Sequence, residues 1–458
     1  MLTHEENELM CRVGPGTPMG EFIREYWIPA FLTSELPEPD GAPLRARLLG
    51  ENLIAFHTTS GKYGLMQNAC PHRGASMFFG RNEEDGLRCV YHGWKFDTAG
   101  NCIDMPNEPA ESNFKHKIRA AAYPCVEVGG IVWAYMGPRE TPPSMYDFPA
   151  LKEPNLQVGV RLQECSYMQA LEGDIDTVHA FFLHAGHQKH EGTLPGSPDY
   201  YSTRTRDARF VVRPMELGAT YAAIRPAEDG FEYWRMGHYL LPFWTMNAPG
   251  LLGVKNNCTA WVPLDDENTL IWSIGVNQRG LDPNTEGVGG LKAGVNRDDP
   301  AGKNDPYGRG ARNLGLAGRK FLPDTSGWLG RWRPLANKDN DYLIDRDLQK
   351  TATYSGIPQP AQDPMAQESM GPIYDRTKER LGTTDGMIIQ TRRKLIGAAR
   401  AHREGTPAPG VDRPELYHMR GGGAIVPVGV DGIEGLADLH YDRVTLAAFK
   451  AGGGVKAR

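Results

Sequence analysis

The chain has 458 residues, a formal net charge of −6 and 40% hydrophobic residues. This is about three times the usual domain length, so two or three domains, or one large domain with an insertion, are expected. The small negative charge offers no broad basic surface, which argues against a nucleic-acid partner.

The sequence also lacks the patterns of membrane and secreted proteins. No stretch reaches 18 consecutive apolar residues, and the N-terminus has no basic segment followed by an apolar one. We therefore expect a cytoplasmic protein with no membrane partner. Seven scattered cysteines do not resemble a disulfide framework, and in a reducing compartment clustered Cys and His indicate metal binding.

The first 150 residues are predicted to contain two units. Residues 1–44 read as a helical segment that packs on the downstream domain, because apolar side chains recur at helical spacing over 18–27. Residues 45–150 read as a small all-β domain that ends in a Pro-rich linker. Its β-rich runs are Asn52 to His57, Leu87 to Val90 and Gly130 to Met136.

Residues 151–458 are predicted to form one larger domain of mixed composition. A Gly- and Asp-rich excursion over 280–318 and the tail after 405 match no recognised pattern. Apolar periodicity and turn residues predict three β-rich runs and three helices. The runs are 209–224, 233–239 and 269–276, and the helices are 168–184, 365–381 and 385–403.

Two short Cys and His pairs in the β-rich region form the first metal-binding pattern. One residue separates Cys70 from His72, two separate Cys89 from His92, and 16 lie between the pairs. Each pair can bind a metal from one tight loop. Two thiolates and two imidazoles suit either a tetrahedral zinc or a [2Fe–2S] cluster with one iron held by both cysteines and the other by both histidines.

The surroundings of these pairs favour the iron–sulfur cluster. A zinc finger places its histidines on a helix, whereas these pairs lie at hairpin-like ends of a β-rich segment. Gly74 and Gly93 are expected to free backbone N–H groups that donate to the sulfides, which raises the reduction potential. The four ligands followed by Gly93 and Trp94 closely resemble the Rieske motif of aromatic-ring oxygenases.

A second pattern lies downstream, where Asp176 precedes His179 and His184. Two histidines and a remote carboxylate on one face of a non-haem Fe(II) leave positions open for dioxygen. On a regular helix the two histidines would point about 140° apart. They can share an iron only if the helix bulges or breaks, so we predict a π-bulge or break near Phe181 and Phe182. The alternative is two histidines that cap or pack a core helix.

After a Rieske motif, this second pattern resembles the mononuclear iron motif of the same oxygenases. The resemblance implies that His179 and His184 bind Fe(II). It also implies that Asp176 orients His179 and forms an electron-transfer bridge across a subunit interface to His92 of a neighbouring chain. A closed cyclic assembly, a homotrimer or a dimer of trimers, follows from that bridge.

The third iron ligand is expected near the C-terminal part of the chain. Residues 340–346 and 362–373 resemble the phthalate dioxygenase-like branch, in which a helical Asp closes the triad, and that residue would be Asp363. An Asp before a Pro also fits a helix N-cap. Glu368 and Asp345 are weaker candidates.

The resemblance covers nearly the whole chain and implies an α+β fold. A small all-β Rieske domain would precede a catalytic domain with an antiparallel sheet flanked by helices, of the helix-grip type. The activity implied is that of an oxygenase component, an oxidoreductase of aromatic catabolism that uses O2 and reductase-supplied electrons to hydroxylate an aromatic substrate. A monooxygenase or O-demethylase of a methoxylated aromatic acid is the alternative.

The electrons must come from another protein. No Gly-x-Gly-x-x-Gly opens a helix after a strand, so the chain is not expected to oxidise NADH or NADPH itself. The family implies a separate reductase with a flavin and a plant-type iron–sulfur centre. From other classes of protein, a Rieske electron carrier without catalysis and a zinc-binding module stay open as alternatives.

The substrate is expected to be an aromatic acid. Arg225 and Arg235 lie on expected strands of the catalytic region, and arginines in such strands clamp aryl carboxylates in related enzymes, as bidentate donors do. Most arginines are surface residues, which is the alternative for both. Four aromatic side chains can line an aromatic pocket or pack in a core. They are Phe181, Phe182, Phe243 and Trp244.

Overall fold

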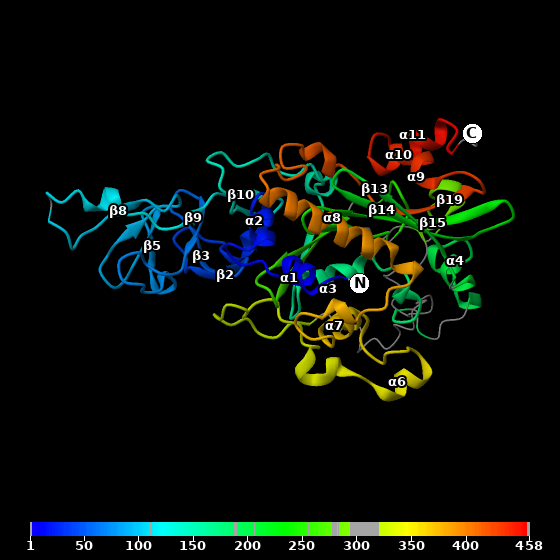
Figure 1. The fold of residues 1–458 in the computed structure, drawn as a ribbon, viewed down its shortest axis with the longest axis horizontal. Helices are drawn as coiled ribbons and strands as arrows, with labels where there is room; N and C mark the ends of the chain where they lie inside the picture. Colours follow the sequence, from blue (N-terminus) through cyan, green and yellow to red (C-terminus); the bar gives the residue numbers. More distant parts are fainter. Residues whose placement is uncertain are drawn as a thin grey trace.

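The computed structural model describes residues 2–455 of the chain, except 110, 185, 187–189, 206, 249, 255–256, 277–281, 283 and 294–319. The molecule is elongated, with a small β-rich lobe (residues 44–124) at one end and a large mixed lobe (residues 151–455) at the other (Figure 1). Of the helices in the described ranges, none combines the length and the hydrophobicity needed to span a bilayer.

The small lobe consists of two four-stranded antiparallel sheets. Their strand orders are β2-β3-β4-β9 and β5-β6-β7-β8. The strands are short because tight turns interrupt them, such as the one at Glu84 and Asp85, both at positive φ. Their bounds are β2 (Leu44–Leu48), β3 (Glu51–His57), β4 (Tyr63–Gln67), β5 (Arg81–Glu83), β6 (Gly86–Arg88), β7 (Lys95–Phe96), β8 (Cys102–Asp104) and β9 (Ala122–Tyr123).

A third sheet connects the two lobes, with strand order β1-β11-β10. It contains β1 (Trp27–Leu32), β10 (Cys125–Val128) and β11 (Ile131–Tyr135). All five residues of β11 are buried in the same hydrophobic core as the sheet of the large lobe. The predicted N-terminal segment therefore supplies a strand in addition to its two helices, and its boundary at residue 44 stays a prediction, as does the one at 150.

The large lobe is built on one antiparallel sheet. Its strand order is β12-β18-β17-β16-β15-β14-β13, and β19 also pairs with β15. The predicted run 209–224 forms two strands, because a turn at 215–217 reverses the chain. The strands are β12 (Leu156–Gln163), β13 (Arg209–Pro214), β14 (Gly218–Pro226), β15 (Phe231–Leu240), β16 (Trp244–Met246), β17 (Asn257–Pro263), β18 (Thr269–Val276) and β19 (Gly422–Pro427).

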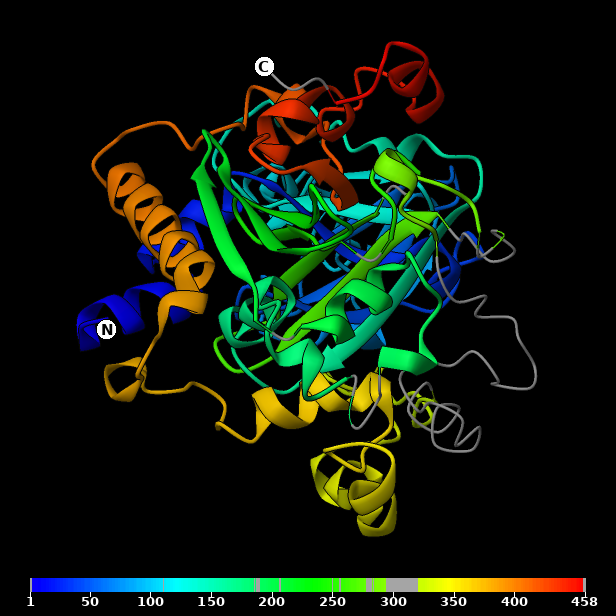
Figure 2. The same ribbon diagram turned by 90° about the vertical axis from the view of Figure 1, so that its right-hand side faces the viewer.

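Helices cover both faces of this sheet (Figures 1 and 2). On one face, α3 packs against β15 to β17 and α8 against β13 and β14, with α1 and α2 stacked on α8. On the other, the C-terminal helices bury Trp234 and Met236 of β15 against Leu436 and Leu439. The helices are α1 (His4–Cys11), α2 (Pro18–Arg24), α3 (Tyr167–Ile175), α4 (Pro198–Arg204), α6 (Arg346–Thr351), α7 (Gln359–Glu368), α8 (Gly386–Arg403), α9 (Gly432–Gly435), α10 (Ala437–His440) and α11 (Leu446–Ala451).

Two of the helix predictions are wrong in extent. The helix expected over 168–184 ends at Ile175, and the one expected over 365–381 is α7, which ends at Glu368. After α7 the chain turns at Gly371 (φ +88°) and brings Arg376 to 3.2 Å from the buried carboxylate of Glu172. Gly371 at positive φ, followed by Pro372, ends the helix although the apolar pattern continues.

The C-terminal tail completes the sheet, a role that its sequence did not indicate. β19 pairs with β15 in antiparallel register, from Phe231 opposite Pro427 to Met236 opposite Gly422. Most of the predicted excursion over 280–318 lies outside the described residues.

Two buried histidines fasten the tail to the sheet. His238 of β15 and His440 of α10 face the same carbonyl, that of Arg420, at 3.0 and 3.3 Å. Because a carbonyl only accepts, both ring nitrogens that face it carry a proton. Burial lowers the pKa of His238 to about 3 and that of His440 to about 4, so both rings are neutral in the fold. The nearest ion pair is Arg420 with Asp442.

Acid pH is expected to destabilise this attachment. The unfolded pKa of histidine is about 6.5, above both folded values, so below pH 6.5 the unfolded chain binds protons that the folded chain does not. Stability is therefore full above that pH and lost as pH falls toward the folded pKa values. Between pH 7.5 and 5.5 the two histidines together lower the free energy of unfolding by about 2.7 kcal/mol, measurable by urea unfolding followed through tryptophan fluorescence.

A matched variant separates this effect from other acid-sensitive groups. His440→Gln keeps an amide donor for the Arg420 carbonyl but cannot titrate, so it should show about half of the wild-type contribution to the pH slope. An identical slope in both proteins would contradict the assignment.

Candidate functional site

The first Cys and His pair lies in the loop after β4, and the second lies between β6 and β7. Both loops are closed in the same way: Gly74 N–H donates to the Cys70 carbonyl at 2.9 Å, and Gly93 N–H to the Cys89 carbonyl at 3.0 Å. Both glycines have a positive φ angle, 76° and 80°, which residues with a side chain rarely adopt. The N–H groups of Gly74 and Gly93 themselves thus close the turns, and the prediction that the glycines free backbone N–H groups for hydrogen bonds to sulfides stays a prediction.

In these two loops the cysteine side chains lie beside each other, and so do the two histidine rings. Cys70 and Cys89 are buried and interact, and burial raises the pKa of the Cys70 thiol to about 11. The ring centroids of His72 and His92 are 4.4 Å apart, and His72 stacks on Trp94. In the described part of the chain, the buried Nδ1 of His72 has no hydrogen-bond partner, as expected for a nitrogen placed to bind a metal.

The separation of the two pairs distinguishes one metal from two. A tetrahedral zinc brings all of its Cys and His ligand atoms within about 3.8 Å of one another. Among the described residues, no three of these four ligand atoms lie within 4.8 Å of one another. A bridged pair of irons, with the sulfurs on one and the imidazoles on the other, fits this arrangement, and a single zinc ion does not.

The second site begins where α3 ends. Asp176 is the C-cap residue of α3 and has an extended backbone. A separate short 3-10 helix then begins at His179 and covers His179–Phe181. The regular helix thus breaks before His179, earlier than predicted, and the short 3-10 helix itself ends at Phe181 with Phe182 as its cap, so the predicted break near these residues is present without a π-helix among the described residues there. The break removes the constraint of a regular helix, and the Nε2 atoms of His179 and His184 lie 3.2 Å apart.

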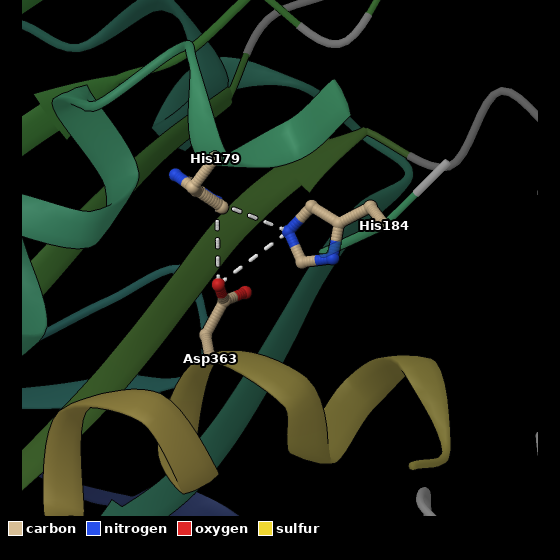
Figure 3. A group of neighbouring side chains, drawn as sticks. All are labelled: His179, His184 and Asp363. Atoms are coloured by element: carbon tan, nitrogen blue, oxygen red, sulfur yellow. Dashed lines mark hydrogen bonds and ion pairs between the residues drawn. The ribbon is translucent and has the colours of Figure 1, made fainter. Parts of the chain in front are cut away.

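Asp363 of α7 completes a triad with the two histidines (Figure 3). Its Oδ1 lies 3.3 Å from Nε2 of His179 and 3.4 Å from Nε2 of His184. Three atoms at this spacing lie roughly 1.9 Å from their common centre, close enough for all three to bind one ion with bonds of about 2.1 Å. Pro358 is the cap residue of α7, so Asp363 does not cap the helix.

The charges in this triad are strongly coupled. Burial alone would lower the pKa of His179, but its contacts with Asp176 and Asp363 raise that pKa to about 10. Burial would also raise the pKa of Asp363, and the two histidines hold it well below its usual range. The site therefore favours a carboxylate that faces positive charge, which a divalent cation supplies as well as protons do.

The two weaker candidates for the third ligand are engaged elsewhere. Glu368 accepts hydrogen bonds from the backbone N–H of Glu164 at 3.0 Å and from the hydroxyl of Tyr342 at 2.6 Å. Asp345 caps α6, accepting from the N–H groups of Asp347 and Leu348.

Asp176 lies behind His179, on the side away from Asp363. Its Oδ2 is 3.5 Å from Nδ1 of His179, and its Oδ1 accepts a 2.8 Å hydrogen bond from the N–H of Val178. Its side chain is 28% exposed, so part of the carboxylate is accessible from outside this chain. The bridge to His92 of a neighbouring chain stays a prediction.

The two arginines lie on one face of the sheet but differ in their surroundings. Arg225 pairs with Tyr233, two residues from Arg235, so all three side chains share a face. Arg235 lies close enough to Tyr221 and Asp174 to act electrostatically on both.

Arg225 is a buried cation that forms no ion pair with an acidic residue among those the structure describes, although the charge of Asp207 acts on it. It is 0% exposed, and neither Nη1 nor Nη2 has a hydrogen-bond partner there. Its Nε donates to the Thr205 carbonyl at 3.2 Å, and its guanidinium carbon lies 4.0 Å from the ring centroid of Phe181. Burial lowers its pKa to about 10.

Two of the four aromatic candidates pack in the core. Phe243 and Trp244 are fully buried, and Trp244 stacks with Trp133. Phe181 lies under Arg225, whereas Phe182 is exposed and contacts Tyr354.

Sequence reasoning missed one residue beside the triad. Gln362 contacts His184 at 2.7 Å, and its place next to Asp363 was the only signal available.

Comparisons with known proteins agree with this geometry. A family described as the Rieske [2Fe–2S] domain matches residues 26–124, and one described as LigXa C-terminal domain like matches 134–291 and 316–434. The oxygenase subunit of 3-chlorobenzoate-3,4-dioxygenase from Comamonas testosteroni is 42% identical over 437 residues, covering 94% of this chain and 97% of its own.

Two further similarities concern sequence and fold. The oxygenase subunit of phthalate 4,5-dioxygenase from Pseudomonas putida is 36% identical over 425 residues, covering 90% of this chain and 89% of its own. The crystal structure of dicamba monooxygenase bound to dicamba shares the fold, with a TM-score of 0.53, 16% identity and coverage of 84% of this chain and 99% of that one.

Proposed function

This chain belongs to the Rieske oxygenases of aromatic compounds, as an oxygenase subunit, and from that premise we propose that it hydroxylates an aryl carboxylate at a mononuclear iron held by His179, His184 and Asp363. It is an oxidoreductase that incorporates dioxygen and works with a reductase partner. The observation that carries the proposal is the triad of ligand atoms, spaced 3.2–3.4 Å apart, in a chain that also has a Rieske domain.

The Rieske [2Fe–2S] cluster has four candidate ligands, and each has a defined environment. Cys70 and Cys89 would hold one iron from the buried side of the loops, and His72 and His92 the other. His92 is more accessible than the cysteines, which places one end of the cluster near the surface. The backbone N–H groups of His72 and Arg73 favour the Cys70 thiolate, and such bonds raise a cluster's potential.

A mononuclear Fe(II) in the triad would supply the site at which dioxygen is reduced beside the substrate. The chain's own residues prepare this site. Asp363 provides the charge, and Asp176 holds the Nδ1 proton of His179, which leaves Nε2 free as a ligand.

Electron delivery requires a second chain and a second protein. A partly exposed Asp176 and a partly exposed His92 can meet across an interface, which we propose occurs in a homotrimer or a dimer of trimers. The reductase is proposed to carry a flavin and a plant-type iron–sulfur centre and to draw electrons from NADH or NADPH.

The substrate class rests on Arg225. A buried guanidinium whose two Nη atoms lack partners in the described chain costs free energy unless an anion pairs with it. A carboxylate accepts from both Nη atoms in a bidentate pair. Phe181, which lies against this guanidinium, follows His179 by two residues, so a ring attached to that carboxylate lies close to the triad.

Replacing Arg225 by methionine is expected to weaken carboxylate binding. Loss of a bidentate charged pair, worth about 1.5–3 kcal/mol, should raise KM for the aryl carboxylate about 10- to 100-fold while KM for the neutral carboxamide analogue changes little. Steady-state oxygen uptake measures both. Arg209→Met is the control, because Arg209 is exposed and pairs with Glu232. Equal effects of Arg225→Met on acid and amide would argue against the clamp.

Product analysis tests the reaction itself. After anaerobic reconstitution of the metal centres, the chain is assayed in air with a surrogate reductase and a series of aromatic acids, with oxygen uptake and products measured together. A cis-dihydrodiol or another hydroxylated acid formed in proportion to O2 supports ring hydroxylation. A phenol released with formaldehyde identifies an O-demethylase, and electron uptake without any product leaves only an electron carrier.

A further inference from the structure

Gln362 connects the triad to the segment in front of α7. Its side chain is 1% exposed, and its amide is held at both ends. Oε1 lies 2.7 Å from Nδ1 of His184, while Nε2 donates to the Ser355 hydroxyl and to the Ile357 carbonyl, both at 3.1 Å.

These contacts determine which way the amide points. The Ile357 carbonyl can only accept a hydrogen bond, so the amide atom that faces it must be the NH2 group. The atom facing His184 is then the amide oxygen, which can only accept. Nδ1 of His184 therefore carries the proton, and its Nε2 presents a lone pair to the centre of the triad.

The two triad histidines thus have partners of different charge. His179 has the carboxylate of Asp176 behind it, whereas His184 has a neutral amide. A carboxylate makes a histidine ligand more basic than an amide does, so the two imidazoles are not equivalent donors. The amide fixes the ring and its proton without a second negative charge behind the metal.

We propose that Gln362 is a positioning residue that locks His184 in the Nδ1–H tautomer and aims its Nε2 at the iron. This inference rests on the proposed iron site at His179, His184 and Asp363. The Ile357 carbonyl orients the amide of Gln362, and the amide oxygen orients the imidazole of His184. Its Nε2 lone pair would then already point toward the metal position.

Gln362→Met tests the proposal, because methionine has a similar length and no amide. Loss of the orienting partner should raise the dissociation constant for the mononuclear Fe(II) about 10- to 100-fold in anaerobic titrations. Ser355→Ala is the matched control, since it removes one contact of Nε2 but leaves the Ile357 carbonyl, and its constant should change less than about threefold. The Rieske electron paramagnetic resonance signal and the urea midpoint report whether each variant is folded.

A second variant separates orientation from packing. Gln362→Glu keeps a carboxyl oxygen that accepts the Nδ1 proton of His184 in either protonation state, so it should retain Fe(II) like the wild type. The ¹⁵N signals of His184 in metal-free protein should show a protonated Nδ1 in the wild type and in Gln362→Glu, and mixed tautomers in Gln362→Met.

The outcomes distinguish the two levels of the argument. Wild-type protein that binds only the two irons of the cluster overturns the proposed function. If wild-type protein binds a third iron, but the Fe(II) affinity and the ¹⁵N signals of His184 are the same in wild type, Gln362→Met and Gln362→Glu, only the role of Gln362 is overturned. If Gln362→Met and Gln362→Glu lose iron alike, packing and not the hydrogen bond is what Gln362 provides.

Discussion

Asp363→Ala is expected to abolish turnover while the Rieske centre stays intact. The substitution leaves two neutral imidazoles to hold a dication in a buried site, so the mononuclear iron should be lost and product formation should fall below about 1% of wild type. Iron analysis should show about two atoms per chain where wild type has about three, with unchanged acid-labile sulfide.

Asp345→Asn is the control for this experiment. Asp345 was the other aspartate considered as a ligand, and asparagine can still cap α6, so iron content and turnover should both be retained. An Asp363→Ala chain that keeps its third iron and its activity would remove Asp363 from the site.

Asp176→Asn is expected to slow electron transfer strongly while the Rieske centre stays intact, in protein assayed at an Fe(II) concentration that keeps the triad filled, because loss of the carboxylate behind His179 also weakens Fe(II) binding about 10- to 100-fold. Asparagine can still accept the Val178 N–H bond, so the turn before His179 should survive. Asparagine lacks the negative charge that stabilises a protonated His179 or, across the proposed bridge, a protonated His92. Asp-to-Asn changes behind other histidines lower turnover by about 10²- to 10⁴-fold, and we expect a similar fall here. The measurement is the rate at which the prereduced Rieske centre is reoxidised after substrate and O2 are added.

A mixing experiment tests whether that transfer occurs between chains. A Cys89→Ser chain lacks a cluster ligand and an Asp363→Ala chain lacks an iron ligand, so neither should turn over alone. If Asp176 of one chain meets His92 of the next, mixed assemblies should recover part of the activity. If Asp176→Asn reoxidises at the wild-type rate, or mixed assemblies stay inactive, the bridge between chains is excluded.

Much of the fold was predictable because its signals are local. The apolar periodicity predicted α2 and α8, and short β-rich runs separated by turns predicted β3, β6, β11, β13 to β15 and β18. The failures share a cause. The helix expected over 168–184 ends early at Asp176, whose carboxylate accepts the Val178 N–H, and the helix expected over 365–381 ends before Gly371, at positive φ, and Pro372.

The sequence by itself determined the chemistry of this protein: which side chains can bind metal, in which short loops they stand, and that two different iron sites are implied. Short-range spacing carries that information, because side chains a few residues apart can reach one metal centre wherever the loop lies. Only the tertiary structure decided which carboxylate faces His179 and His184, that the two Nη atoms of Arg225 lack partners in the described chain, and that Gln362 contacts His184. These depend on how α7 packs beside α3, and such packing arises from many distant contacts that no local pattern records.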